Sequence, residues 1–203
     1  MKRTLGVVLA LLLVCSFAFA EDAVSSATLK MEKLPAVETR ENGILVAYFS
    51  PDDTVRAAAY AIAGALSAEL FEIEPAEPYT PDDLNYMNSK SRSMVEMGNS
   101  QARPEILAFP EDLGGFHTVI LCYPIWGGQA PRIILTFLEG VDLSGKTVIP
   151  FATSNSSGIG SSDKALRAVT GESAEWLTGL GIRKGATEED IRLWAESLNL
   201  QGN

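Results

Sequence analysis

Short apolar runs alternate along this chain with segments in which apolar residues recur at helical spacing. Residues 44–49 and 118–123 are almost continuously apolar, which is typical of strands buried on both faces of a parallel sheet. Residues 54–70 instead place their apolar side chains on one face of a helix. By the same criteria we expect further strands at 70–74, 146–153 and 174–182, and further helices at 131–139, 161–169 and 187–198.

This alternation of strands and helices predicts the fold class. Strands separated by helices form parallel sheets through right-handed crossovers, with helices on both faces. We therefore expect an α/β three-layer sandwich with a five-stranded parallel sheet, and the count fits the strand order 2-1-3-4-5. The interval between the second and third strands is long and rich in proline. We expect a helix within it that begins near Pro81 and ends before Gly98.

The first 20 residues have the pattern of a secretory signal peptide. Lys2 and Arg3 precede an apolar run that is too short to span a membrane comfortably, and small residues end at Ala20. We expect cleavage after Ala20, export to the periplasm or the cell exterior, and no membrane span in the mature chain. A lipid anchor on Cys15 is the alternative, which the bulky Val14 before it disfavours.

The rest of the chain divides into two regions. Residues 21–42 are polar and show no sustained period, so we interpret them as a flexible N-terminal arm. Residues 43–203 form the predicted domain, which is long enough to bury a substantial core.

The charge and the cysteine count exclude several classes of function. The chain carries 16 basic and 26 acidic side chains, and loss of residues 1–20 would take its net charge from −10 to −12. Nucleic acids and anionic membranes both require clustered positive charge, so we expect neither as a partner. The mature chain would keep one cysteine, Cys122, and one histidine, His117. This set provides neither a disulfide nor a metal cluster, and we expect Cys122 to be a small buried apolar residue.

Three loops at strand ends carry the candidate chemistry. They span residues 48–54, 123–128 and 151–160, and each begins at the end of a predicted strand. In an open parallel sheet, ligands bind outside the carboxyl ends of the strands, where the strand order reverses. The three loops are therefore predicted to meet in one crevice. Glycines in the second and third loops would let the backbone approach a planar ligand closely.

Several short motifs, in this order and spacing, resemble those of flavodoxin-like proteins over residues 43–200. The motifs are Tyr48-Phe49-Ser50, Phe71-Glu72-Ile73-Glu74-Pro75, Pro78-Tyr79, Ala102-Arg103-Pro104, Tyr123-Pro124-Ile125-Trp126, Ala130-Pro131-Arg132, Asp142-Leu143-Ser144-Gly145-Lys146 and Ser157-Gly158-Ile159-Gly160-Ser161-Ser162. The resemblance implies the flavodoxin-like strand order, non-covalent FMN, and either electron transfer or flavin-dependent reduction of a small acceptor. It leaves the redox partner open, whether protein or small molecule, and assigns no catalytic side chain.

The resemblance also assigns the positions that would contact the flavin. The first loop would cradle the FMN phosphate through Ser50, Asp53, Thr54 and Val55. The second loop would border the isoalloxazine ring through Tyr123, Pro124, Ile125, Trp126, Gly127 and Gly128. The third loop would line the other side of the ring and the ribityl chain through Thr153, Ser154, Asn155, Gly158, Ile159 and Gly160. Either Trp126 or Tyr123 would form the aromatic wall of the ring.

The first loop departs from the family pattern, which typically reads Ser-x-Thr-Gly-Asn-Thr. Only Pro51, Asp52 and Asp53 separate Ser50 from Thr54, so the loop is one residue shorter and lacks the glycine. Pro51 also has no amide to donate. A carboxylate within ~5 Å of a phosphate would repel it by about 1 to 3 kcal/mol.

Two functions follow from these observations. The leading one is an exported protein that binds FMN for electron transfer or for reduction of a small acceptor. The alternative is a flavin-free binding module that keeps the scaffold, in which Asp53 merely caps the helix that follows the degenerate loop. The resemblance also has a second departure. Gly127 stands where the family commonly has a tryptophan, so one aromatic side chain that could face the isoalloxazine ring is missing.

Overall fold

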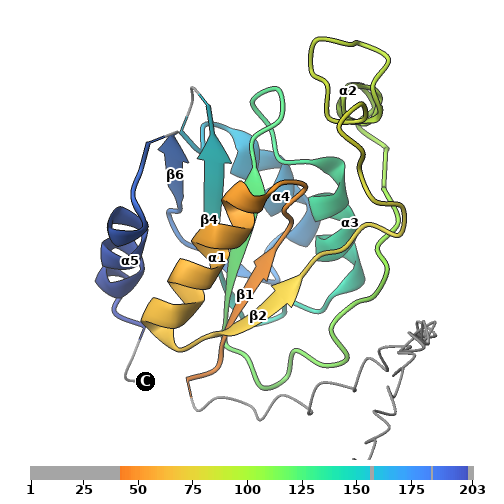
Figure 1. The fold of residues 1–203 in the computed structure, drawn as a ribbon. Helices are drawn as coiled ribbons and strands as arrows, with labels where there is room; N and C mark the ends of the chain where they lie inside the picture. The colour runs from red at the N-terminus through yellow and green to blue at the C-terminus, as the bar shows by residue number, and fades with distance from the viewer. Residues whose placement is uncertain (1–41, 156–157, 184, 201–203) are drawn as a thin grey trace, which may run out of the picture. The chain divides into compact units, whose positions relative to one another are not determined.

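The computed structural model describes residues 42–155, 158–183 and 185–200 (Figure 1). Its elements are β1 Ile44–Tyr48, α1 Asp53–Leu66, β2 Glu69–Glu72, α2 Arg92–Gly98, β3 Thr118–Pro124, α3 Arg132–Gly140, β4 Thr147–Ser154, α4 Ser162–Thr170, β5 Glu175–Trp176, β6 Leu180–Arg183 and α5 Glu188–Ser197. The predictions for the signal peptide, for Cys15 and for almost all of the N-terminal arm lie outside the described residues. None of the helices in the described part of the chain is long and apolar enough to cross a membrane.

The strands form a parallel sheet in the order β2-β1-β3-β4-β5, which confirms the predicted fold class. Strand order reverses between β1 and β3, because the chain moves to opposite sides of β1 to form β2 and β3. Tyr48 of β1 lies in register with Cys122 of β3, which pairs in turn with Phe151 of β4. The carboxyl ends of these three strands therefore lie at neighbouring positions along one edge of the sheet.

The last predicted strand, residues 174–182, is divided into two short strands that both pair with β4. β5 pairs with the beginning of β4 and β6 with its end, so the interruption falls beside Pro150. Proline has no amide hydrogen and cannot donate to a ladder on that side. Gly179 lies against Pro150 so closely that an added Cβ would overlap the Pro150 carbonyl. Proline thus breaks the pairing, and glycine accommodates the close approach.

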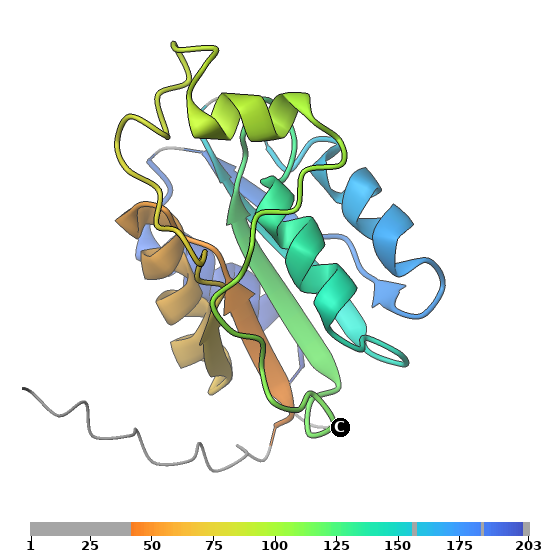
Figure 2. The same cartoon turned by 90° about the vertical axis from the view of Figure 1, so that its right-hand side faces the viewer.

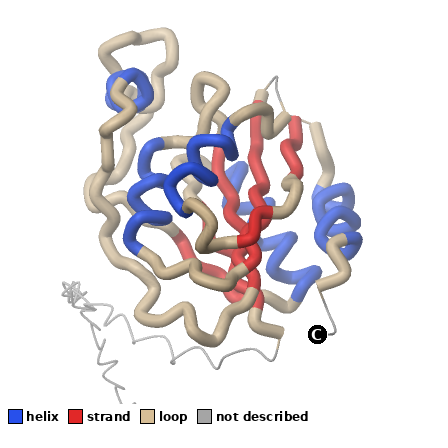
Figure 3. The backbone as a smooth tube through the Cα atoms, turned by 180° about the vertical axis from the view of Figure 1, so that it is seen from behind, coloured by secondary structure: helices blue, strands red, loops and turns tan. Residues whose placement is uncertain are grey.

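Helices α1 and α5 cover one face of the sheet, and α3 and α4 cover the other (Figures 1 and 3). All five residues of β1 are buried because neighbouring side chains point to opposite faces and both faces are covered. Leu45 and Ala47 join the cluster under α3 and α4, whereas Val46 joins the cluster under α1 and α5. Cys122 belongs to the second cluster, and burial raises the pKa of its thiol.

The helix predicted from Pro81 onward is wrong over most of its length. Only α2, Arg92–Gly98, is helical, and the residues before it form a series of turns. The side-chain oxygen of Asn85 accepts from the Met87 amide at 3.1 Å, and that of Asn88 accepts from the Lys90 amide at 3.0 Å. Such local bonds offer the backbone an alternative to helical hydrogen bonding. The two asparagines therefore stabilise turns where the apolar spacing favoured a helix.

The segment that contains α2 leaves the domain and returns beside its own starting point. Pro75 and Ile106 form an antiparallel bridge, and the Leu107 amide donates to the Glu74 carbonyl at 2.8 Å. Figure 2 shows α2 lying across the carboxyl edge of the sheet, near the beginning of α3. A guanidinium nitrogen of Arg132, at the start of α3, donates to the Met97 carbonyl at 3.0 Å. The long connection is thus tied to the domain at the carboxyl edge of the sheet.

Candidate functional site

Backbone hydrogen bonds place the three loops side by side at the carboxyl edge of the sheet. The Phe49 amide, where the first loop begins, donates to the Cys122 carbonyl of β3 at 3.0 Å. The Ile125 amide of the second loop donates to the Thr153 carbonyl of β4 at 2.8 Å. The loops after β1, β3 and β4 are therefore neighbours in that order.

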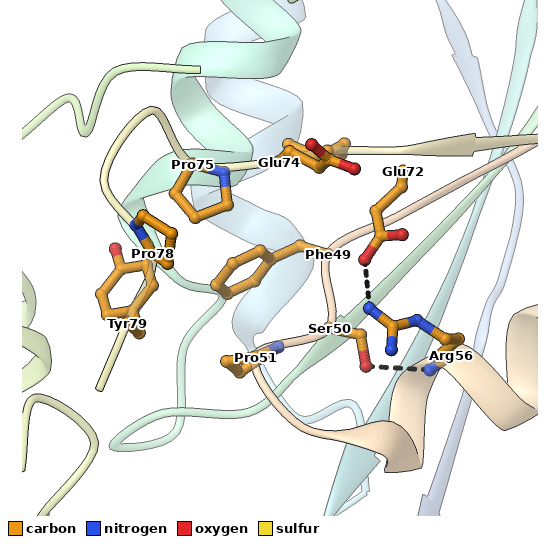
Figure 4. A pocket seen from close by; sticks show the side chains of 10 residues that line it. Phe49, Ser50, Pro51, Arg56, Glu72, Glu74, Pro75, Pro78 and Tyr79 are labelled. Atoms are coloured by element: carbon orange, nitrogen blue, oxygen red, sulfur yellow. Dashed lines mark hydrogen bonds and ion pairs between the residues drawn. The ribbon is translucent and has the colours of Figure 1, made fainter. Parts of the chain in front are cut away.

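The first loop satisfies amides of α1 with its own side chains. A carboxylate oxygen of Asp52 accepts from the Thr54 amide at 3.0 Å. The Ser50 hydroxyl oxygen accepts from the Arg56 amide at 2.9 Å, as Figure 4 shows. The Ser50 hydroxyl also donates to the Asp52 carbonyl. The N-cap of α1 is therefore Asp52. The alternative interpretation of the loop had placed Asp53 at this position.

Asp53 instead points into solvent beside a charged network. Its carboxylate lies 3.1 Å from one guanidinium nitrogen of Arg56, and another nitrogen of Arg56 lies 2.6 Å from a carboxylate oxygen of Glu72. The second Glu72 oxygen accepts from the Tyr48 hydroxyl at 2.9 Å. Burial, followed by the contact with Glu72, raises the pKa of Tyr48. The positive charge of Arg56 is thus shared between two carboxylates.

A hollow of about 260 Å³ lies beside this loop, between β2 and the segment that follows it. Its walls come from Phe49, Ser50, Pro51, Arg56, Glu72, Ile73, Glu74, Pro75, Pro78 and Tyr79. Phe49 extends toward the two prolines and Tyr79, whereas Arg56 and Glu72 lie on the opposite side (Figure 4). Arg56 is the only basic side chain among these described lining residues, and two acidic ones accompany it.

The second loop contains a two-residue turn built from two glycines. The Trp126 amide donates to the Gln129 carbonyl at 2.9 Å, and the Gln129 amide returns to the Trp126 carbonyl at 3.0 Å. Gly127 has φ of 55° and Gly128 has φ of 82°, which is the pattern of a type I′ hairpin turn. Both glycines are exposed. The turn requires a residue that tolerates positive φ at position 127, and glycine meets this requirement without strain.

Replacing Gly128 with alanine is expected to lower the free energy of unfolding by about 1 kcal/mol, because an L side chain is strained at positive φ. Space is not the cause, since a Cβ at this position meets nothing within 4 Å. Urea unfolding of both proteins measures the difference. Equal stabilities would contradict the turn geometry described here.

Trp126 packs edge to face against two other aromatic rings. Its centroid lies 5.7 Å from that of Phe49 and 5.5 Å from that of Tyr79, and these two rings are themselves 5.7 Å apart. Tyr79 is held in turn by the Arg92 guanidinium, 4.0 Å above its ring, and by its hydroxyl, which donates to Glu96 at 2.6 Å. The segment that carries α2 therefore fixes the position of Trp126 from outside the loop.

Tyr123, the other candidate for the aromatic wall, is a core residue. Its side chain is fully buried in the core under α3 and α4, and its hydroxyl lies 3.0 Å from the Ser162 hydroxyl. Burial raises the pKa of its phenol. The strand pleat turns the Tyr123 side chain into the core, so of the two candidate aromatic walls only Trp126 is partly exposed. The assignment of both residues to the flavin site stays a prediction.

The third loop is held from both sides. The Ser162 hydroxyl donates to the Ile159 carbonyl at 2.7 Å, and the loop backbone at Gly158 and Ile159 rests directly on Gly181 of β6. Thr153 is buried at the end of β4, whereas Asn155 and Gly160 are exposed. The assignments of Thr153, Ser154, Asn155, Gly158, Ile159 and Gly160 to a ligand remain predictions, and the intervening residues 156–157 lie outside the described part of the chain.

Several residues that shape this edge were not among the predicted site residues. Arg56 and Glu72 form the charged network, Tyr79 fixes Trp126, and Gly181 supports the third loop. The Pro78-Tyr79 motif was visible in the sequence, but its contact with the second loop depends on the return of a long connection. Gly181 carries no local signal that distinguishes it from a turn glycine.

The strand order and the parallel register define a doubly wound α/β protein, and the three adjoining loops form a candidate site at the switch point of its sheet. The chain belongs to the flavodoxin family, whose sequence profile matches residues 43–198. No curated protein gives a significant match.

Solved structures agree with this assignment. A candidate flavoprotein from Bacteroides eggerthii is 44% identical, over 77% of this chain and 97% of that one, with a TM-score of 0.70. A second, from Bacteroides uniformis, is 41% identical over 75% of this chain and 97% of its own, with a TM-score of 0.71. A flavoprotein in complex with FMN from Lactobacillus acidophilus is 20% identical, over 67% of this chain and 90% of that one, with a TM-score of 0.55. At this identity, the similarity supports the fold alone.

Proposed function

We propose that this protein binds FMN without a covalent bond at the carboxyl edge of its sheet and functions in electron transfer. Membership of the flavodoxin family supports the proposal, and the FMN complex of the Lactobacillus acidophilus flavoprotein illustrates the ligand on a related fold. The observation that carries it is the pair of adjoining loops after β3 and β4, joined by the hydrogen bond from Ile125 to Thr153. This pair offers exposed glycine backbone beside a partly buried tryptophan.

The ring end of the site fits an isoalloxazine. The Gly127-Gly128 turn is exposed and has no side chains that would keep a planar ligand from its backbone. Trp126 supplies an aromatic surface, and the glycines of the third loop allow close approach from the other side. Bound flavin would supply the electron chemistry, whereas the chain positions the ring and sets the surrounding charge. The net charge of −10 disfavours added negative charge, so we expect the potential to fall below that of free FMN.

The phosphate end of the site does not fit in the same way. A phosphate at a helix N-terminus is bound by exposed amides and by the helix dipole. In this chain, Asp52 and Ser50 accept from the amides of Thr54 and Arg56. Any contribution of the phosphate to affinity must compete with these bonds and with the charge of Asp52.

Titration of the full chain with FMN tests this proposal, with visible absorption and flavin fluorescence as readouts. We expect a shifted, structured absorption band and quenched fluorescence at micromolar flavin. Trp126→Leu is expected to weaken binding by about tenfold, because an aromatic contact contributes about 0.5 to 1.5 kcal/mol beyond its buried area. Trp176→Leu is the matched control, since Trp176 lies in β5 and pairs with the beginning of β4, away from the loops. Absence of binding at several hundred micromolar FMN would favour the flavin-free binding module.

We extend the proposal to the export of the protein. The basic residues, the apolar run and the small residues before position 21 support a cleaved signal peptide. Expression in a bacterium that has a periplasm, followed by mass spectrometry of each fraction, tests it. A periplasmic chain that begins at Glu21 is expected, and a full-length chain confined to the cytoplasm would contradict export.

A further inference from the structure

We propose that the site recognises the ring and the ribityl chain of a flavin and gains no affinity from the terminal phosphate, so that riboflavin binds at least as tightly as FMN. This inference rests on the proposed function, because it concerns ligand selection at the same edge of the sheet. It makes Asp52 a specificity-determining residue.

The first support is that the loop already occupies amides that a phosphate would need. The Asp52 carboxylate accepts from the Thr54 amide at 3.0 Å, and the Ser50 hydroxyl accepts from the Arg56 amide at 2.9 Å. Pro51 contributes no amide at all. A phosphate could reach the Thr54 and Arg56 donors only by breaking both bonds, whereas a ligand without a phosphate leaves them intact.

The second support is the balance of charge around the loop. Asp52 and Asp53 are both exposed at the start of α1, where a phosphate would lie. Arg56 is the one basic side chain among the described residues that line the adjoining hollow, and its guanidinium already lies 3.1 Å from Asp53 and 2.6 Å from Glu72. Redirecting it to a phosphate would leave two carboxylates without their ion pair. The loop therefore presents negative charge to the end of the ligand.

The same groups suit an uncharged hydroxyl. A carboxylate is a strong hydrogen-bond acceptor, and the terminal hydroxyl of riboflavin is a donor that carries no charge. Asp52 or Asp53 can therefore accept from that hydroxyl, whereas the phosphate of FMN offers mainly acceptor oxygens. The loop would select against the phosphate and tolerate or favour the free polyol.

Parallel titrations of the full chain with riboflavin and with FMN test this inference by flavin fluorescence. We expect the Kd for riboflavin to be equal to or lower than the Kd for FMN. Added salt should tighten FMN binding and leave riboflavin binding unchanged, because salt screens repulsion between exposed charges. At a conventional phosphate site, which attracts the phosphate charge, added salt would instead weaken FMN binding.

Two substitutions at one position separate the charge from the occupied amide. Asp52→Asn keeps the N-cap and removes the charge, and Asp52→Gly also removes the acceptor from the Thr54 amide at little cost to the helix. Each is expected to strengthen FMN binding relative to riboflavin, by about tenfold for Asp52→Asn and by more for Asp52→Gly, given the expected repulsion. Asp142→Asn is the matched control. Asp142 accepts from the Ser144 amide at 2.9 Å in an equivalent turn before β4, at the opposite edge of the sheet.

The outcomes distinguish this inference from the proposed function. Binding of FMN at least about tenfold tighter than riboflavin in the unaltered protein, a difference of about 1.4 kcal/mol, would overturn the inference and leave the flavin function intact. Failure of both flavins to bind would overturn both. An equal gain in FMN affinity in Asp52→Asn and Asp142→Asn would show a general effect of net charge and would overturn the assignment to Asp52.

Discussion

Replacing Phe49 with alanine is expected to lower the free energy of unfolding by roughly 3 to 5 kcal/mol and to weaken flavin binding in the molecules that remain folded. Phe49 is 1% exposed and packs against both Trp126 and Tyr79. Its loss would create a cavity and would remove one of three rings that contact one another. Urea unfolding measures the first effect, and FMN titration under conditions in which the variant is folded measures the second.

Phe137→Ala is the matched control for this prediction. Phe137 of α3 is also completely buried, and its ring stacks on that of Phe71 in β2, with 5.9 Å between the ring centroids. Neither residue belongs to the three loops. We expect a similar loss of stability with little change in flavin affinity. If Phe49→Ala retained the flavin affinity of Phe137→Ala, the aromatic group would have no part in positioning the ligand.

Replacing Gly181 with alanine is expected to weaken flavin binding by roughly tenfold or more and to destabilise the fold by roughly 1 to 3 kcal/mol, as overpacking does elsewhere. An added Cβ would overlap the backbone of the third loop at Gly158 and Ile159. Backbone cannot move aside as the end of a flexible side chain can, so the loop or β6 must shift. The shift would separate the third loop from the second, where we place the ring.

Gly64→Ala provides the contrast, because a Cβ at that position meets nothing within 4 Å in the interior of α1. Alanine is favoured over glycine in a helix by about 0.5 to 1 kcal/mol, so this variant should be slightly more stable. Flavin titration and urea unfolding of the two variants make the comparison. Unchanged flavin affinity in Gly181→Ala would show that the third loop does not contact the ligand.

The sheet could be predicted from the sequence because its strands are buried on both faces. A continuous apolar run such as residues 44–48 has few other stable placements, and both faces of β1 are in fact covered. The last helix, predicted from residue 187, begins at a capping box. The Thr187 hydroxyl accepts from the Asp190 amide at 3.1 Å, and the Asp190 carboxylate accepts from the Thr187 amide at 2.8 Å. Asp190 takes the place of the usual Glu or Gln.

The errors have local physical causes that apolar periodicity does not reveal. Asn85 and Asn88 bond to amides two residues ahead and replace the expected helix with turns. Pro150 interrupts pairing on one side of β4 and divides the last strand. The resemblance offered Tyr123 as one of two aromatic walls, but strand alternation directs its side chain into the core.

The adjacency of the three loops was predicted more successfully than the contacts of their side chains. The switch-point rule places the three loops at one edge, and the hydrogen bond from Phe49 to Cys122 joins the first loop to β3 there. Which aspartate caps α1 depends on one backbone conformation, and Asp52 adopts the extended one. The role of Tyr79 depends on a connection that returns over a long stretch of sequence, which no short motif encodes.

Chemical-shift mapping of the ¹⁵N-labelled full chain with FMN and with riboflavin tests most directly where the flavin lies. We predict that both ligands shift the amides of residues 126–128 and 158–160 and the indole of Trp126, and that the two ligands affect the Thr54 and Arg56 amides alike. Large shifts at the Thr54 and Arg56 amides with FMN but not with riboflavin would show that the first loop binds the phosphate, which contradicts the inference on ligand selection. Shifts confined to regions outside the loops after β3 and β4 would contradict the proposed flavin site itself.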